Sequence, residues 1–178
     1  MSAVISDCTL YRYRLERRWD GYSTLMFVMV NPSTADAVED DQTIKKCIGF
    51  AKRAGYGRIL VGNKFAFRAT DVNKLREQHD PIGPDNDAHL REMMCEADCV
   101  VAGWGQLAKL PESLRKRWYT VVRLADQEGK ALHCIGVNAD KHPKHPQMTG
   151  YDVPIAPCDV PFFIGRNRPL SAGERKTP

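Results

Sequence analysis

Continuous apolar runs alternate along the chain with segments whose apolar residues recur every three or four positions. Four short runs predict buried strands, at 25–30, 58–63, 99–103 and 131–137. Three intervening segments place their apolar residues on one helical face and predict helices, at 41–55, 84–97 and 111–129. The stretch 9–19 alternates loosely. With Gly21 and Ser23 at a bend, it predicts an antiparallel partner for the strand at 25–30.

Strands that alternate with helices favour parallel strands, right-handed crossovers and helices on both faces. We therefore predict an α/β fold: a three-layer α/β/α arrangement with a central four-stranded parallel sheet plus an N-terminal antiparallel strand. Four prolines interrupt any regular element after residue 152, and the chain ends in a basic stretch. This predicts a single α/β domain at 1–151 and a Pro-rich basic C-terminal tail at 152–178.

Composition narrows the class of protein. A chain of 178 residues with 43% apolar and 27% charged residues suits one globular domain and excludes wholesale disorder. Its longest apolar run is far shorter than the about 20 residues needed to cross a bilayer, and its charged first twenty residues do not form a secretory signal. We expect a cytoplasmic monomer with no membrane partner and six reduced cysteines. The net charge of +4 permits a polyanionic partner.

Polar residues follow each of the four predicted parallel strands. Asn31-Pro32 follows the first, 63–71 the second, Trp104-Gly105 the third, and the segment 141–146 the fourth. Because the carboxyl ends of parallel strands meet at one edge of a sheet, these segments should form a single active or binding cleft.

The carboxamides of this edge admit two interpretations. Asn31 can hold a water or a ligand, or it can close a turn before Pro32. Asn63 can pair with the edge of a base, or it can bond the nearby backbone. An aspartate that follows Asn31 can act as a general base, whereas Asp40 or Asp41 is also suited to cap the next helix.

The segment 141–146 presents two histidines on a rigid loop. His142 and His145 alternate with prolines, and a neutral imidazole N–H can stabilise a developing oxyanion. The adjacent Lys141 and Lys144 can contact phosphate. These histidines show no recognised ligand spacing with the other His and Cys residues, so we expect no metal and no cofactor.

Arg68 also carries two interpretations. Its guanidinium suits a phosphate contact, or equally a salt bridge to Asp71.

The ordered motifs resemble the uracil-DNA glycosylase superfamily, and among its members the branches whose first motif is Asn-Pro. The resemblance spans roughly 25–151, and four segments in order are similar to superfamily motifs: 27–32, 60–63 followed by 67–70, 100–105, and 135–146. The chain also resembles a bacterial and phage family of unassigned function that has an Asn-Pro-Ser-Thr-Ala-Asp segment and a doubled His-Pro.

The resemblance implies a uracil-DNA glycosylase-like fold and hydrolysis of the N-glycosidic bond of a uracil-like or modified base in DNA, flipped into the cleft. Asn31 would hold the attacking water, Asp36 would supplement it, and His142 or His145 would hydrogen-bond the base oxygen. Asn63 would read the base edge, with Trp104 also in the base site. Phe50 would stack on the base, with core packing as the alternative. The implied phosphate contacts are Ser33, Arg68, Lys141 and Lys144.

Three departures from the superfamily pattern keep other functions open. Ser33 stands where the Asn-Pro branches usually have Gly, no Asp precedes Pro32, and no Leu-rich wedge follows the histidines. The alternatives are a non-catalytic nucleic-acid or nucleotide-binding protein that uses the same cleft, and an N-glycosidase of free nucleosides or nucleotides.

Overall fold

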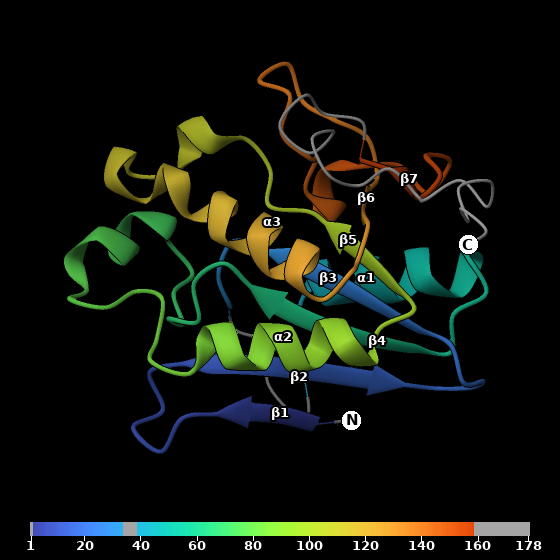
Figure 1. Cartoon of the computed structure of the whole chain (residues 1–178), viewed down its shortest axis with the longest axis horizontal. Helices are drawn as coiled ribbons and strands as arrows, with labels where there is room; N and C mark the ends of the chain where they lie inside the picture. Colours follow the sequence, from blue (N-terminus) through green and yellow to red (C-terminus); the bar gives the residue numbers. More distant parts are fainter. Residues whose placement is uncertain (1, 34–38, 159–178) are drawn as a thin grey trace, which may run out of the picture.

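Four parallel strands form the centre of one mixed sheet in the computed structural model, which describes residues 2–33 and 39–158. The sheet has the order β1-β2-β4-β3-β5-β6-β7 (Figure 1). Its strands are β1 (Ser2–Ile5), β2 (Arg12–Arg18), β3 (Thr24–Met29), β4 (Arg58–Asn63), β5 (Cys99–Ala102), β6 (Leu132–Cys134) and β7 (Ala156–Pro157). Neighbours within β4-β3-β5-β6 are parallel, and β1, β2 and β7 are antiparallel to their neighbours. The predicted α/β class and the central four-stranded parallel sheet are confirmed.

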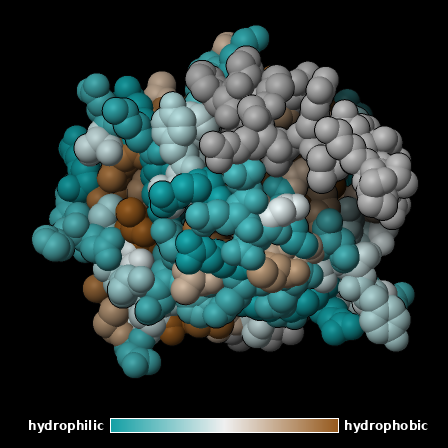
Figure 2. All heavy atoms as spheres, in the orientation of Figure 1, coloured by the Kyte–Doolittle hydropathy of each residue, from teal (hydrophilic) through white to brown (hydrophobic). Residues whose placement is uncertain are grey.

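Helices cover both faces of this sheet. The α-helices are α1 (Gln42–Arg53), α2 (Asn86–Glu96) and α3 (Trp118–Gln127). The chain also forms four short 3₁₀ helices among its described residues: η1 (Val72–Glu77), η2 (Leu107–Lys109), η3 (Glu112–Arg117) and η4 (Pro146–Met148). In Figure 1, α2 and α3 cross the near face and α1 lies behind the sheet. The near face presents mostly hydrophilic side chains to solvent (Figure 2). Among the described residues, no helix has the length and apolarity to cross a membrane.

β3 is buried on both faces, which explains its continuous apolar run. Met26 and Val28 pack in the cluster that contains α2 and α3, whereas Leu25 and Phe27 pack in the cluster that contains α1. Every residue of β3 is buried. A strand placed between two layers of helices has no polar face, so the alternation typical of a half-exposed strand is absent.

The predicted pairing of the N-terminal strand with the strand at 25–30 is wrong. β2 pairs with β4, with Leu15 opposite Val61, because both edges of β3 are occupied by the parallel strands β4 and β5. The fold therefore has two N-terminal antiparallel strands instead of one, since β1 adds to the outer edge of β2.

The sheet also continues beyond the domain boundary predicted at residue 151. β7 pairs with β6, with Cys134 opposite Ala156, so the first part of the predicted tail belongs to the sheet. Residues 159–178 lie outside the described part of the chain.

The start of α1 is fixed by a helix cap. The Asp41 side chain accepts a hydrogen bond from the Ile44 backbone N–H at 2.9 Å, which confirms the predicted cap. Asp40 instead forms an ion pair with Arg17 at 2.7 Å and ties the segment before α1 to β2. This pair holds the residues on the N-terminal side of α1 against the sheet.

Lys64 lies directly after β4 and is fully buried. Its Nζ makes no hydrogen bond with any described residue, and it lies 5.4 Å from the centre of the Trp104 ring. Burial, together with the positive charge of Arg117, lowers the pKa of Lys64 to about 7. An amine in this position destabilises the folded state because its charged form loses hydration without gaining a partner.

Replacement of Lys64 by Met should stabilise the protein. Between the folded pKa of about 7 and the ordinary value of 10.5, the unfolded chain binds the additional proton, so wild-type stability should rise with pH through this range. Lys64→Met should raise the free energy of unfolding by about 1–3 kcal/mol at pH 7 and remove this slope. Urea unfolding at pH 6, 7.5 and 9 measures both effects. The exposed Lys45→Met is the control, and an unchanged slope in Lys64→Met would contradict the assignment.

Candidate functional site

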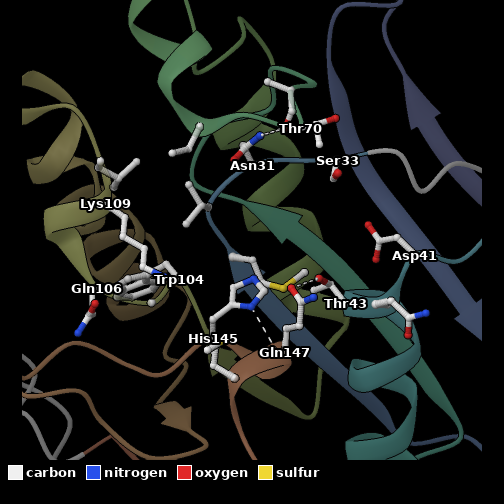
Figure 3. A pocket seen from close by; sticks show the side chains of 18 of the residues that line it. Asn31, Ser33, Asp41, Thr43, Thr70, Trp104, Gln106, Lys109, His145 and Gln147 are labelled. Atoms are coloured by element: carbon white, nitrogen blue, oxygen red, sulfur yellow. Dashed lines mark hydrogen bonds between the residues drawn. The ribbon is translucent and has the colours of Figure 1, made fainter.

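A cavity of about 620 Å³ lies at the carboxyl ends of the parallel strands. Segments that follow all four strands line it: the end of β3, the stretch 69–72 beyond β4, the stretch 104–110 after β5, and the loop after β6. The first residues of α1 complete the wall. Figure 3 shows the labelled polar side chains arranged around this common space. The convergence of the strand ends follows from the parallel sheet.

Asn31 is held in a fixed orientation at the cavity wall. Its Nδ2 donates to the Ala69 carbonyl at 2.6 Å (Figure 3). The same nitrogen donates to the Pro32 carbonyl at 3.1 Å. Its Oδ1 accepts no hydrogen bond from a described residue. The side chain therefore closes the turn with its amide nitrogen, which confirms that interpretation. Its oxygen is left as an acceptor on the cavity wall, and the role of Asn31 in holding a water or ligand stays a prediction.

His145 presents a neutral imidazole to the same cavity. Its Nδ1 accepts a hydrogen bond from the Gln147 backbone N–H at 3.3 Å, which assigns the ring proton to Nε2. Burial lowers the pKa of His145, Lys109 lowers it further, and Asp41 opposes these effects. The ring is therefore neutral at pH 7, and Nε2–H is the donor that it offers to a ligand.

Asp41 supplies a carboxylate at the cavity wall in addition to capping α1. One oxygen accepts from Ile44, while Oδ2 accepts no hydrogen bond from a described residue. The resemblance implied Asp36 as the aspartate that supplements Asn31, and Asp36 lies outside the described residues. Within the described part of the chain, Asp41 is the aspartate that lines this cavity.

Trp104 and Ser33 line the cavity, whereas His142 does not. The Trp104 indole donates to Nδ1 of His142 at 3.4 Å, and the His142 ring packs edge-on against Trp118. His142 is 5% exposed, so it lies behind Trp104 and supports it. Of the two predicted histidines, His145 is the one that lines the cavity, and its catalytic role stays a prediction.

Two residues predicted to bind the base are buried outside the cavity lining. Phe50 is 3% exposed and packs edge-on against Tyr151 at 5.0 Å in the core around α1, so core packing is the role that the structure shows. Asn63 is 1% exposed, and neither of its side-chain polar atoms has a hydrogen-bond partner among the described residues. Asn63 lies beside Met29 in the sheet, and Met29 does line the cavity.

The three predicted cationic phosphate contacts also lie outside the main cavity. Arg68 lines a second hollow of about 380 Å³ that shares Ser33 with the first. Its Nη1 donates to the Thr9 carbonyl at 3.3 Å, and no salt bridge joins it to the described Asp71. Lys141 is exposed, and Lys144 is half-buried against Gly136; both lie outside the linings of these two hollows.

Several cavity residues had no signal in the sequence. Arg12 is 2% exposed on β2, and its position depends on the unpredicted pairing of β2 with β4. Lys109 lies in η2, and the Thr43 hydroxyl is 3.5 Å from Oε1 of Gln147 across the cavity wall. No group of three or more His, Cys, Asp or Glu side chains in the described ranges could hold a metal ion.

One family model, described as a protein of unknown function (DUF1643), matches residues 12–147. The chain belongs to the DUF1643 family. No curated protein and no solved structure matches it. The matched range of this DUF1643 protein contains Asn31, Asp41, Trp104 and His145, and it therefore covers the polar wall of the cavity.

The His145 ring should titrate below its ordinary pKa of 6.5. Lys109→Gln should raise that pKa because it removes a nearby positive charge, and NMR titration of the imidazole ring protons measures the change. Lys116→Gln, an exposed change that does not affect the pKa of His145, is the control. A wild-type His145 that titrates at or above 6.5 would contradict the neutral assignment.

Proposed function

We propose that this protein is a uracil-DNA glycosylase-like hydrolase that cleaves the N-glycosidic bond of a uracil-like or modified base in DNA. One observation carries the proposal: a fixed acceptor, Asn31 Oδ1, and a neutral donor, His145 Nε2–H, line the same cavity. The resemblance of the strand-end motifs to the superfamily supports the same reaction and a superfamily-like fold.

The reaction places positive charge on the sugar and negative charge on the departing base. The cavity offers groups suited to both. Asn31 Oδ1 would orient a water toward C1′ of the sugar, and the Asp41 carboxylate would accept its proton as the C–O bond forms. The bond from C1′ to the base nitrogen breaks, and the base leaves with the bonding pair. His145 Nε2–H would then hydrogen-bond the base oxygen on which negative charge grows.

Base recognition would use Trp104 and Asn63. The flat indole of Trp104 forms part of the cavity wall and suits contact with a planar base. Burial of an amide without partners costs about 1–3 kcal/mol, and both polar atoms of Asn63 are in that state. A base that enters past Met29 would supply the missing hydrogen bonds, which supports Asn63 as the reader of the base edge.

The strand beside the flipped nucleotide would follow the second hollow. Ser33 lies between the two hollows and Arg68 lies in the second, so their hydroxyl and guanidinium groups suit consecutive phosphates. Lys141 and Lys144 belong to the loop that carries His145 and would add charge at its outer side.

The test is base release from oligonucleotides that carry uracil, mismatched or modified bases, detected as alkali-labile abasic sites. Asn31→Ala and His145→Ala should each reduce the rate by at least about 100-fold, because each removes a group that acts at the reacting bond. His79→Ala changes an exposed histidine outside the cavity and should leave the rate unchanged. The absence of abasic sites with every substrate would contradict the proposal, as would full activity of both cavity variants.

Met148 supports action on duplex DNA. The sequence showed no Leu-rich wedge after the histidines, but Met148 is 75% exposed at the cavity rim, within the 3₁₀ turn that follows His145. Apolar side chains such as Met insert between base steps when proteins open a duplex, and a long unbranched thioether suits this role.

Met148→Ala should reduce base release from duplex substrates by about 10-fold, with little effect on single strands that need no opening. The rates on matched duplex and single-stranded oligonucleotides give the comparison. Because Met148 is exposed, its removal should not change the melting temperature. An equal loss on both substrates would show that Met148 acts otherwise than as a wedge.

An N-glycosidase of free nucleotides is the second candidate. It is favoured by the position of Arg68, Lys141 and Lys144 outside the main cavity, whose volume suits a small ligand. Faster release of base from mononucleotides than from oligonucleotides would select it. Salt-dependent binding without release of base would instead select the non-catalytic binder.

A further inference from the structure

Two buried cysteines lie at the base of the loop that carries His145. Cys134 ends β6 and Cys158 directly follows β7. Cys134 is opposite Ala156 in the antiparallel pair, and the Cys158 backbone N–H donates to the Leu132 carbonyl at 2.9 Å. Because side chains alternate along a strand, Cys158 lies on the same face as Cys134. Both belong to the core cluster around α2 and α3.

The two thiols lie near each other across the β6–β7 pair. The Cys158 side chain and a backbone hydrogen bond from Gly136 lower the pKa of Cys134 to about 7, and burial opposes them. The lowered pKa favours the thiolate of Cys134, which is the reactive form of cysteine. The exposed Cys95 is different, because its hydrogen bond to Glu128 raises its pKa. A lowered pKa and a neighbouring second thiol coincide at Cys134.

We propose that Cys134 and Cys158 form a reversible disulfide when the protein meets a hydroperoxide. The Cys134 thiolate attacks the peroxide oxygen, the O–O bond breaks, and Cys134 becomes a sulfenic acid as the other oxygen leaves as water or an alcohol. The Cys158 sulfur then attacks the Cys134 sulfur and forms the S–S bond, and the sulfenic oxygen leaves as water. Overall, two thiols are oxidised by two electrons and one peroxide is reduced.

The fold allows this bond to form with a small displacement. β7 is a two-residue strand at the edge of the sheet, and among the described residues β6 is the strand that it pairs with. The two sulfurs must approach each other to form an S–S bond of about 2.0 Å. That approach requires movement of an edge strand and not of the central sheet.

The disulfide would restrain one wall of the cavity. The segment 135–157 that it closes contains Asn138, His145 and Gln147, all of which line the cavity. Closing this loop restricts the unfolded chain and fixes the base of the His145 loop. This inference does not depend on the proposed function, since it concerns only β6, β7 and the loop between them.

The test uses the full chain with the exposed Cys8 and Cys95 changed to Ser, so that intermolecular products do not interfere. After treatment with hydrogen peroxide, intact mass should fall by about 2 Da and peptide mapping should link Cys134 to Cys158, with reversal by dithiothreitol. The oxidised protein should melt roughly 5 °C higher than the reduced protein.

Two further variants keep the proposal falsifiable. Cys158→Ser should abolish the mass loss and leave Cys134 as a sulfenic acid that dimedone traps, whereas Cys47→Ser, a buried change in the other core cluster, should leave the mass loss intact. The proposal is overturned if Cys134 and Cys158 both remain free thiols after peroxide treatment, or if the linked peptides contain Cys47 or Cys99 instead.

Discussion

The parallel pairing of β3 with both β4 and β5 is the constraint on which the cavity depends. Once β3 has a parallel neighbour on each side, the segments that leave these strands emerge at one edge of the sheet. The hydrogen bond from Asn31 to the Ala69 carbonyl then joins the segment after β3 to the segment beyond β4. The helices on the two faces hold this arrangement by burying β3 completely.

Polar side chains near this edge destabilise the folded state more than the polar side chains of an ordinary core do. Lys64 and Asn63 are adjacent in sequence, both are buried, and their side-chain polar atoms lack hydrogen bonds among the described residues. Residues of this kind lower the free energy of unfolding. Their concentration beside a cavity is typical of a site where a protein gives up stability for binding or chemistry. The stable centre of the sheet tolerates them because the surrounding apolar clusters are large.

The parallel core was predicted well because the period and the length of apolar runs are local signals in the sequence. The strand 58–63 and the helix that begins after Asp41 follow directly from apolar runs and a cap. Partner choice is not local, so the pairing of β2 with β4 and the contribution of Arg12 to the cavity could not be read from alternation. The same limit applies to the histidines, because His142 and His145 have near-identical neighbours in sequence and differ only in what packs over them. β7 was not predicted, because a strand of two residues is too short to show a periodic pattern of apolar residues.

The double use of Asn31 limits what chemistry this position can support. Its amide nitrogen must donate to a carbonyl to keep the wall closed, so an aspartate at position 31 would set a negative charge against the Ala69 oxygen. With this hydrogen bond in place, the residue at position 31 can offer a ligand only an uncharged acceptor. Under the proposed function, the proton of the attacking water would therefore go to another element, and the Asp41 carboxylate at the N-terminus of α1 lies across the same space (Figure 3). In that proposal, two different parts of the fold would hold the strand end and accept the proton.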